Sequence, residues 1–246
     1  MIIDGHVRIG QGREVELTAD TLLDTMDRLG IDRALVAPDE AAIAYHNRRG
    51  NDAVTAAAAS SGGRLLAYAV ANPWRGRDAL DELDRAADRG AVALAVDPVL
   101  QGFDLLDGLL VPLLEFAAAR HWPVYVRTGT PPTALPMPLA LLAGQHPEVR
   151  FVMGRSGATD FWIDAGPALR QAPNLVGDTC YAPWDTVLAA LAADPEIGAN
   201  RLMFSTDAPY TVSATELERV TDWPLTQAER LAVLGGTVAA LLGLQI

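Results

Sequence analysis

The sequence of 246 residues contains no lysine, so all 19 of its basic residues are arginine, and it contains one cysteine, Cys180. The absence of lysine excludes a Schiff-base lysine, a lysine general base and a carbamylated lysine that bridges two metal ions. A lone cysteine excludes an internal disulfide and a cysteine-rich zinc site. Chemistry in this chain must therefore use carboxylates, imidazoles, hydroxyls, guanidinium groups or a single thiol.

Positive charge and long apolar segments are also scarce. The net charge of −12 argues against nucleic acid and anionic membranes as partners, because both bind basic surfaces. The apolar run Val233–Leu244 is interrupted by Gly235 and Gly236 and is shorter than the roughly 20 residues that cross a bilayer. The chain starts with the strand-like Met1-Ile2-Ile3, without the basic and apolar regions of a secretion signal. We therefore expect a soluble cytoplasmic protein.

Half of the residues are hydrophobic, and short apolar segments alternate with amphipathic stretches. The predicted strands are Ile2–Asp4, Arg33–Ala37, Leu65–Val70, Val92–Val96, Val124–Arg127, Arg150–Met153, Leu175–Asp178 and Leu202–Phe204. The predicted helices are Ala19–Leu29, Asn47–Ser60, Arg77–Arg89, Leu109–Arg120, Met137–Gln145, Trp162–Gln171, Trp184–Ala193 and Gln227–Leu242. Strands that alternate with helices indicate a parallel sheet, and eight such units in about 250 residues favour a closed barrel. The sequence predicts a single-domain α/β fold, a (β/α)₈ TIM-type barrel over residues 1–246.

The polar residues that follow the predicted strands form a specific set. In a (β/α)₈ barrel the active site lies at the C-terminal ends of the strands. The segments found there are Asp4-Gly5-His6-Val7-Arg8, Asp97-Pro98, Arg127-Thr128-Gly129, Arg155-Ser156-Gly157, Asp178-Thr179-Cys180 and Ser205-Thr206-Asp207-Ala208-Pro209-Tyr210. We expect these side chains to meet at one end of the barrel.

This set resembles the amidohydrolase-2 branch of the amidohydrolase superfamily, which includes metal-dependent decarboxylases and lactonases. That family has D-x-H-x-H after the first strand, V-x-x-H-x-G at the fifth, H-x-G at the sixth and S-D-x-P at the eighth. The matching segments here are Asp4-Gly5-His6-Val7-Arg8, Val124-Tyr125-Val126-Arg127-Thr128-Gly129, Arg155-Ser156-Gly157 and Thr206-Asp207-Ala208-Pro209. The C-terminal segment 234–244 also resembles the closing helix of the family, so the resemblance covers nearly the whole chain.

The sequence departs from the family at the metal-binding positions. The resemblance implies a divalent metal held by two histidines of the first motif, the fifth-strand histidine and the eighth-strand aspartate. His6 and Asp207 are retained, but Arg8, Arg127 and Arg155 replace histidines, the last of which usually assists catalysis in the family. Arginine has no lone pair for a metal and stays protonated. We therefore predict no metal ion in the family position and no other cofactor.

Three guanidinium groups at one end of a barrel require anionic partners. Asp4, Asp97, Asp178 and Asp207 are candidates for pairing with them, which would leave an inert or structural barrel. Alternatively, the arginines replace the charge of the metal and bind the carboxylate or phosphate of a small substrate. Asp207 would then act as general base with His6 as its proton partner.

The second alternative predicts a metal-independent hydrolase of an ester, lactone or amide in an anionic substrate. Metal-independent lactonases occur in this superfamily, which is an analogy at the level of the fold. A decarboxylase or lyase on the same scaffold and a non-catalytic anion-binding protein remain alternatives. Cys180 and Tyr210 are further candidate substrate contacts, although Cys180 is also a small buried residue where the family often has serine. Relatives are often dimers or larger, so a homo-oligomer is compatible with the resemblance.

Overall fold

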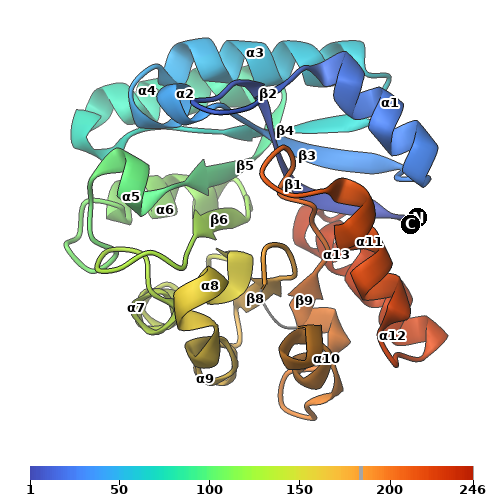
Figure 1. The fold of residues 1–246 in the computed structure, drawn as a ribbon. Coiled ribbons are helices and arrows are strands. Elements are labelled where there is room, and N and C mark those ends of the chain that lie inside the picture. The colour runs from blue at the N-terminus through green and yellow to red at the C-terminus, as the bar shows by residue number, and fades with distance from the viewer. Residues whose placement is uncertain (183–184, 246) are drawn as a thin grey trace.

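The computed structural model describes residues 1–182 and 185–245, and in this part of the chain strands alternate with helices (Figure 1). The strands are β1 (Ile3–Gln11), β2 (Glu16–Leu17), β3 (Arg33–Pro38), β4 (Leu65–Ala69), β5 (Ala91–Val96), β6 (Val124–Arg127), β7 (Phe151–Gly154), β8 (Leu175–Asp178) and β9 (Leu202–Met203). The α-helices are α1 (Ala19–Leu29), α2 (Glu40–Ala44), α3 (Asn47–Ser60), α4 (Arg77–Asp88), α5 (Pro98–Gln101), α6 (Val111–Ala119), α7 (Pro136–Gln145), α8 (Ala158–Phe161), α9 (Ala165–Gln171), α10 (Asp185–Ala193), α11 (Ser213–Asp222), α12 (Gln227–Leu231) and α13 (Thr237–Leu242). Short 3₁₀ segments are η1 (Pro73–Arg75), η2 (Arg155–Gly157), η3 (Trp162–Asp164) and η4 (Ala199–Arg201), and η5 (Ala232–Gly236) is a π-helix.

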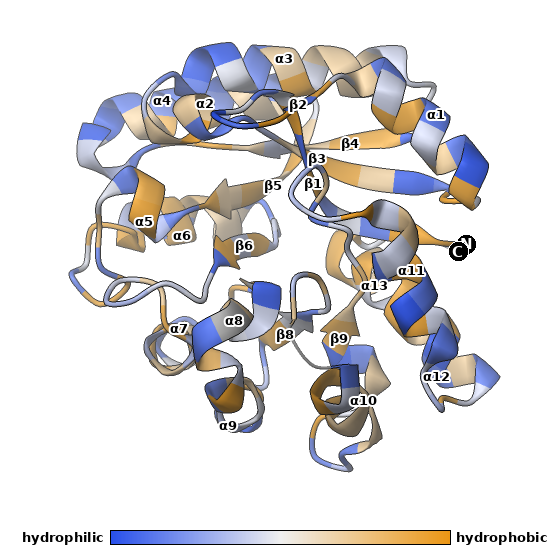
Figure 2. Cartoon of the chain, viewed as in Figure 1, coloured by the Kyte–Doolittle hydropathy of each residue, from blue (hydrophilic) through white to orange (hydrophobic). Residues whose placement is uncertain are grey.

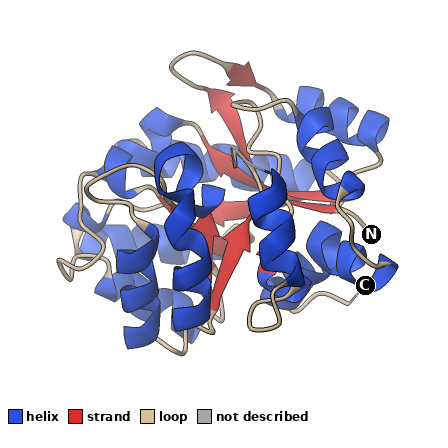
Figure 3. Ribbon diagram, turned by 60° about the horizontal axis from the view of Figure 1, so that its bottom comes forward, coloured by secondary structure: helices blue, strands red, loops and turns tan. Residues whose placement is uncertain are grey.

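The sheet has the strand order β2-β1-β3-β4-β5-β6-β7-β8-β9, with β2 antiparallel to β1 and all other neighbours parallel. Backbone hydrogen bonds then join β1 to the segment that follows β9. The amide of Gly5 donates to Phe204 at 2.9 Å, and the amide of Arg8 donates to Ala208 at 2.8 Å. The sheet therefore closes on itself, with the helices arranged around it (Figure 3). The predicted TIM-type barrel is confirmed.

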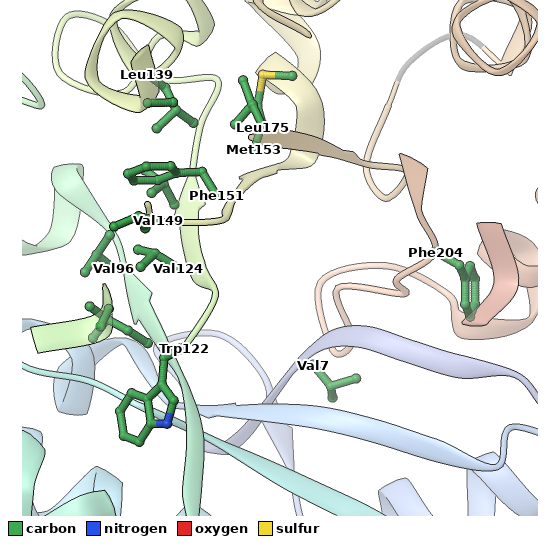
Figure 4. Packing of buried hydrophobic residues seen from close by; sticks show 14 of the residues in the cluster. Val7, Val96, Trp122, Val124, Leu139, Val149, Phe151, Met153, Leu175 and Phe204 are labelled. Atoms are coloured by element: carbon green, nitrogen blue, oxygen red, sulfur yellow. The ribbon is translucent and has the colours of Figure 1, made fainter. Parts of the chain in front are cut away.

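Residues on alternate sides of the strands build two layers of core. In one layer, Val7, Val96, Val124, Phe151 and Met153 pack with side chains from the surrounding helices (Figure 4). The other layer contains the alternate strand residues, which fill the interior of the barrel: Ile3, Leu35, Tyr68, Ala93, Tyr125, Val152, Val176 and Met203. Figure 2 shows the result as apolar strands at the centre and helices of mixed polarity around them.

Most predicted elements agree with the structure to within one or two residues, and α1 and α3 have the predicted bounds. The single predicted helix Gln227–Leu242 is wrong. It is divided into α12, η5 and α13, and Gly235 and Gly236 lie in the π-helical part. A Cβ at Gly235 would stand 2.4 Å from the carbonyl oxygen of Met1, so the close approach of the N-terminal backbone requires glycine here.

Three further corrections concern the ends and the number of elements, and the first is that the strand predicted over Ile2–Asp4 extends to Gln11 as β1. The predicted helix Trp162–Gln171 begins as α9 only at Ala165, after the 3₁₀ turn η3. Trp184, the predicted start of another helix, lies outside the described residues. The short elements β2, α2, α5, α8 and α11 have no counterpart in the prediction. In the described part of the chain, no helix is long and apolar enough to cross a membrane.

Candidate active site

A cavity of about 410 Å³ lies at the C-terminal ends of the barrel strands. Residues from several of the predicted motifs line it, together with residues from the turn between β1 and β2, from α2 and from α5. The lining residues are Arg8, Arg13, Glu14, Val15, Glu40, Asp97, Leu100, Arg127, Arg155, Tyr181, Pro209 and Tyr210. The predicted arginines and Tyr210 therefore meet around one cavity, at the end of the barrel where the fold places active sites.

His6 lies at an irregularity within β1 rather than after the end of this strand. The parallel register between β1 and β3 shifts between Asp4 and Val7, a bulge that changes the direction of the intervening side chains. The ring of His6 stacks on Tyr125 with centroids 4.0 Å apart and planes 3° apart. Burial lowers the pKa of His6 more than the neighbouring carboxylate of Asp207 raises it, so the imidazole is neutral at pH 7.

Asp207 lies behind the wall of the cavity, because it is 1% exposed and, like His6, is not among the residues that line the cavity. Its Oδ1 lies 3.2 Å from Nδ1 of His6, and its Oδ2 lies 2.5 Å from a guanidinium nitrogen of Arg155. Burial by itself raises the pKa of Asp207, but His6 and the positive charges of Arg155 and Arg8 outweigh burial and lower it to about 2. The residue is an ionised carboxylate with a backbone φ of 51°, a strained conformation for a side chain with a Cβ.

The arginines differ in how well they are paired. Arg8 is buried and donates to Asp97 Oδ2 at 3.0 Å, whereas Arg127 lies 3.7 Å from the same oxygen. Burial and the charges of Arg155 and Arg8 lower the pKa of Arg127 despite the attraction of Asp97. In the described part of the chain, the buried Nε groups of Arg8, Arg127 and Arg155 have no hydrogen-bond partner. Other atoms of these three side chains line the cavity, and guanidinium groups bind acceptor oxygens, so the cavity is suited to a ligand that carries such oxygens.

Of the four aspartates predicted as partners of the arginines, Asp97 and Asp207 take this role. Asp4 instead accepts hydrogen bonds from the amide and hydroxyl of Thr206, at 2.9 and 2.6 Å. Burial raises the pKa of Asp4 to about 7, although these hydrogen bonds lower it. Asp178 accepts from neutral groups, including the phenol of Tyr125 at 2.8 Å.

Cys180 was predicted as a substrate contact, but it lies outside the cavity. The side chain is fully buried, does not line the cavity, and its Sγ lies 3.1 Å from Asp178 Oδ2. Burial raises the pKa of the Cys180 thiol well above its ordinary value, and Asp178 and Asp207 add to this effect. The arginines therefore do not produce a thiolate, because their charge is outweighed by desolvation and two carboxylates.

Aromatic rings surround the guanidinium of Arg155. Its central carbon lies 4.3 Å from the ring centroid of Tyr181 and 5.6 Å from that of Tyr210. Tyr210 is also 5.6 Å from the guanidinium of Arg8, and its hydroxyl donates to Glu40. Such cation–π contacts fix planar guanidinium groups without using their N–H donors.

Glu40 and Tyr181 are site residues that the sequence analysis missed. Glu40 follows β3, a strand end whose polar residues were not considered, and the rule used for the other strands would have found it. Tyr181 follows Cys180 directly. Tyr125 was quoted within a motif, but its position beneath His6 depends on tertiary structure and has no local signal in the sequence.

The side chains of this site do not fit a catalytic divalent metal. Within residues 1–182 and 185–245, no group of three or more His, Cys, Asp or Glu side chains is placed to hold a metal ion. His6 and Asp207 provide two donor side chains where a catalytic zinc typically needs three. Arg8 and Arg155 direct positive charge at Asp207, which opposes the approach of a cation.

A family model for amidohydrolases matches residues 3–244, and the chain belongs to this family. 2,6-Dihydroxybenzoate decarboxylase from Rhizobium matches over 98% of both chains, with a TM-score of 0.76 and 20% identity. A manganese-bound dihydroxybenzoic acid decarboxylase from Polaromonas covers 98% of this chain and 96% of its own, with a TM-score of 0.76 and 17% identity. 4-Oxalomesaconate hydratase from Rhodopseudomonas palustris covers 99% and 96%, with a TM-score of 0.71 and 14% identity. The comparison with curated proteins found no match. These similarities confirm the resemblance and the fold.

Proposed function

We propose that this chain is a hydrolase that cleaves a C–O or C–N bond, such as that of a lactone, ester or amide, in a small substrate bearing a carboxylate or phosphate. The observation that carries the proposal is that the side chains of Arg8, Arg127 and Arg155 line one cavity. Guanidinium groups bind carboxylate and phosphate oxygens in bidentate fashion. Arg127 is the main anchor because it is the most weakly paired of the three.

In the proposed reaction Arg155, which lines the cavity, turns from Asp207 towards the anionic group of the substrate, so that a water molecule reaches Asp207. Asp207 accepts a proton from this water while the water oxygen forms a bond to the substrate carbonyl carbon. The carbonyl oxygen becomes negatively charged, and the neighbouring guanidinium groups stabilise that charge. The C–O or C–N bond to the leaving group then breaks, and the proton passes from Asp207 to the leaving oxygen or nitrogen. Neutral His6 contacts the other side of the carboxylate, with its Nδ1 3.2 Å from Oδ1.

The low pKa of Asp207 makes it a weak base in the free protein. Arg155 is one cause of that low pKa, because its positive charge lies 2.5 Å from the carboxylate. When the anionic group of a substrate pairs with Arg155, part of this charge is neutralised. Asp207 then becomes a stronger base at the moment when a substrate is present.

Metal independence is part of the proposal and is supported by the donor set described above. Arg8, Arg127 and Arg155 supply the positive charge that a Lewis acid would otherwise supply. A decarboxylase is the second candidate function, since decarboxylases are among the proteins that share this fold. Under that reaction the same arginines would bind the carboxylate of the substrate, and an ionised Asp207 would need a separate proton source for the product carbanion.

The test is a panel of lactones, esters and amides that carry a free carboxylate, assayed for acid release and, in parallel, for release of CO₂. We expect hydrolysis by the wild-type protein and a loss of about 100-fold or more in Asp207→Asn. Asp24→Asn, at an exposed position of α1, is the matched control and should behave as wild type. Acid release that is unchanged in Asp207→Asn would overturn the mechanism. CO₂ release without hydrolysis would favour the decarboxylase, and anion binding without turnover would favour a non-catalytic protein.

A further inference from the structure

Asp178, the last residue of β8, is completely buried beneath the cavity, and both of its carboxylate oxygens are hydrogen-bonded. Oδ2 accepts from the phenol of Tyr125 at 2.8 Å, from Sγ of Cys180 at 3.1 Å and from the backbone amide of Arg155 at 3.2 Å. Oδ1 accepts from the hydroxyl of Ser205 and from the amide of Cys180 at 3.2 Å. Such complete satisfaction fixes the position of every donor, because each lost bond would leave a buried polar group unpaired.

These donors come from successive parts of the barrel. Tyr125 belongs to β6, Arg155 follows β7, and Ser205 follows β9, so one carboxylate on β8 connects four neighbouring strands. These strands also lead directly to Arg127, two residues after Tyr125, and to Asp207, two residues after Ser205. The hydrogen bonds of Asp178 therefore connect the strands that carry Arg127 and Asp207, and so fix the positions of these residues relative to each other.

Two of the hydrogen bonds lead to side chains of the site. Tyr125, held by its hydroxyl, stacks on the ring of His6 at 4.0 Å. The backbone of Arg155 has a φ of 62°, and its amide donates a hydrogen bond to Asp178. From this position the guanidinium group of Arg155 reaches Asp207. Gly154 allows this arrangement, because a Cβ there would lie 2.4 Å from the ring of Tyr125.

We propose that Asp178 is a positioning residue that sets His6, through the ring of Tyr125, and Arg155, through its backbone amide, against Asp207. Asp178 does not line the cavity, so it acts without touching the ligand. The proposal rests on the proposed function for its effect on catalysis, whereas its effect on His6 and on anion binding is independent of turnover.

The experiment uses Asp178→Asn, which keeps the shape of the side chain but replaces one acceptor oxygen with an NH₂ group that faces donors. The first readout is the NMR signal of the His6 ring. The chain has four histidines, and the signal that is missing from the spectrum of His6→Gln belongs to His6. The second readout is the Kd for succinate by calorimetry. We expect the His6 signal to move and the Kd to rise about tenfold or more, as for a lost hydrogen bond to a charged group.

A double-mutant cycle separates positioning from general destabilisation. If Asp178 acts on the ligand through Arg155, Asp178→Asn should change the Kd little once Arg155→Ala is present. Additive effects on the Kd would overturn this link. Asp24→Asn is again the matched control, with the His6 signal and the Kd of the wild type.

Tyr125→Phe provides a second route if Asp178→Asn does not fold. This variant keeps the ring but removes the hydrogen bond to Asp178, so the ring is free to shift against His6 and the His6 signal should move. An unchanged His6 signal in folded Asp178→Asn, or in Tyr125→Phe, overturns the proposal. Absence of succinate binding by the wild-type protein would count against the proposed ligand class, while the His6 signal would still decide the role of Asp178.

Discussion

Arg155 and Asp207 form an ion pair of 2.5 Å in which the two side chains are 7% and 1% exposed. The family motifs given above imply a catalytic histidine and a metal ligand at these two positions. Here a fixed cation contacts the carboxylate that a metal would otherwise bind. The pair thus keeps Asp207 ionised and, at the same time, places a guanidinium group at the wall of the cavity, where an anion can reach it.

Arg127→Ala should weaken the binding of small dicarboxylates and leave the fold intact. Arg127 lies 3.7 Å from Asp97 and has a buried, unpartnered Nε, so its removal breaks no well-formed ion pair. We expect the Kd for succinate to rise about tenfold to a hundredfold, as for a lost hydrogen-bonded charge. Calorimetry and thermal unfolding of the same preparation measure both effects. A Kd equal to that of the wild type would show that Arg127 is not the anchor.

Arg8→Ala should behave differently, because its removal leaves Asp97 as a buried carboxylate without its closest cation. Breaking a buried pair in this way typically costs on the order of 3 kcal/mol of unfolding free energy. Urea denaturation of Arg8→Ala and Arg127→Ala side by side gives the comparison. Equal stability of the two variants would contradict the assignment of Asp97 to Arg8.

The stability of the protein should depend on pH through Asp4. Its folded pKa of about 7 lies above the ordinary 3.8, so the folded state favours the protonated carboxyl. The resulting stabilisation is complete below pH 3.8 and is lost as the pH rises towards 7, by a few kcal/mol as an order of magnitude. The pKa shift of Asp207 has the opposite effect on stability. Because its folded pKa is lowered to about 2, the stability that it contributes is lost as the pH falls from about 4 towards 2. Urea denaturation at pH 5 and pH 8 should therefore show a smaller difference in Asp4→Asn than in the wild type, and an identical difference would count against this assignment.

Gly154→Ala should displace Tyr125 from His6. The added Cβ would meet the ring of Tyr125 at 2.4 Å, which is closer than real Cβ atoms approach their neighbours. Overpacking of this kind typically costs about 1–3 kcal/mol. We expect reduced thermal stability together with a shifted His6 ring signal. Gly144→Ala in α7, where a Cβ would meet no atom within 4 Å, is the matched control.

The Cys180 thiol should be unreactive in the folded protein. It is buried, contacts Asp178, and has a pKa raised by burial, so little thiolate forms at pH 8. Iodoacetamide labelling followed by mass spectrometry should modify Cys180 only in denaturant. Rapid labelling of the native protein would instead indicate an accessible thiolate and a role for Cys180 in the chemistry.

The sequence predicted the barrel because its evidence is local: β-branched segments, helix ends such as Gly30, and polar residues after each strand. The same strand-end rule found Arg8, Arg127 and Arg155. The position of His6 within β1 was not predictable, because the bulge depends on pairing with β3. The pairing of the arginines with particular aspartates depends on distances across the barrel, which the order of residues along the chain does not encode.

Burial also changed the chemistry expected from the sequence. Cys180 was predicted as a substrate contact or as a small buried residue, and the structure agrees with the second alternative: burial and Asp178 raise the pKa of its thiol. Asp207 was predicted to act as a general base, and its surroundings lower its pKa to about 2, which makes it a weak base in the free protein. For both residues the sequence shows which ionisable group is present. Whether that group carries a proton depends on its burial and on the charges that the fold brings next to it.

The central claim is that arginines supply the positive charge that a metal supplies in metal-dependent relatives. Its most direct test is the hydrolytic activity of protein dialysed against a chelator, with the metal content of the same sample measured by mass spectrometry. The account predicts full activity with far less than one metal ion per chain. Activity that disappears on chelation and returns in proportion to bound manganese or zinc would contradict it.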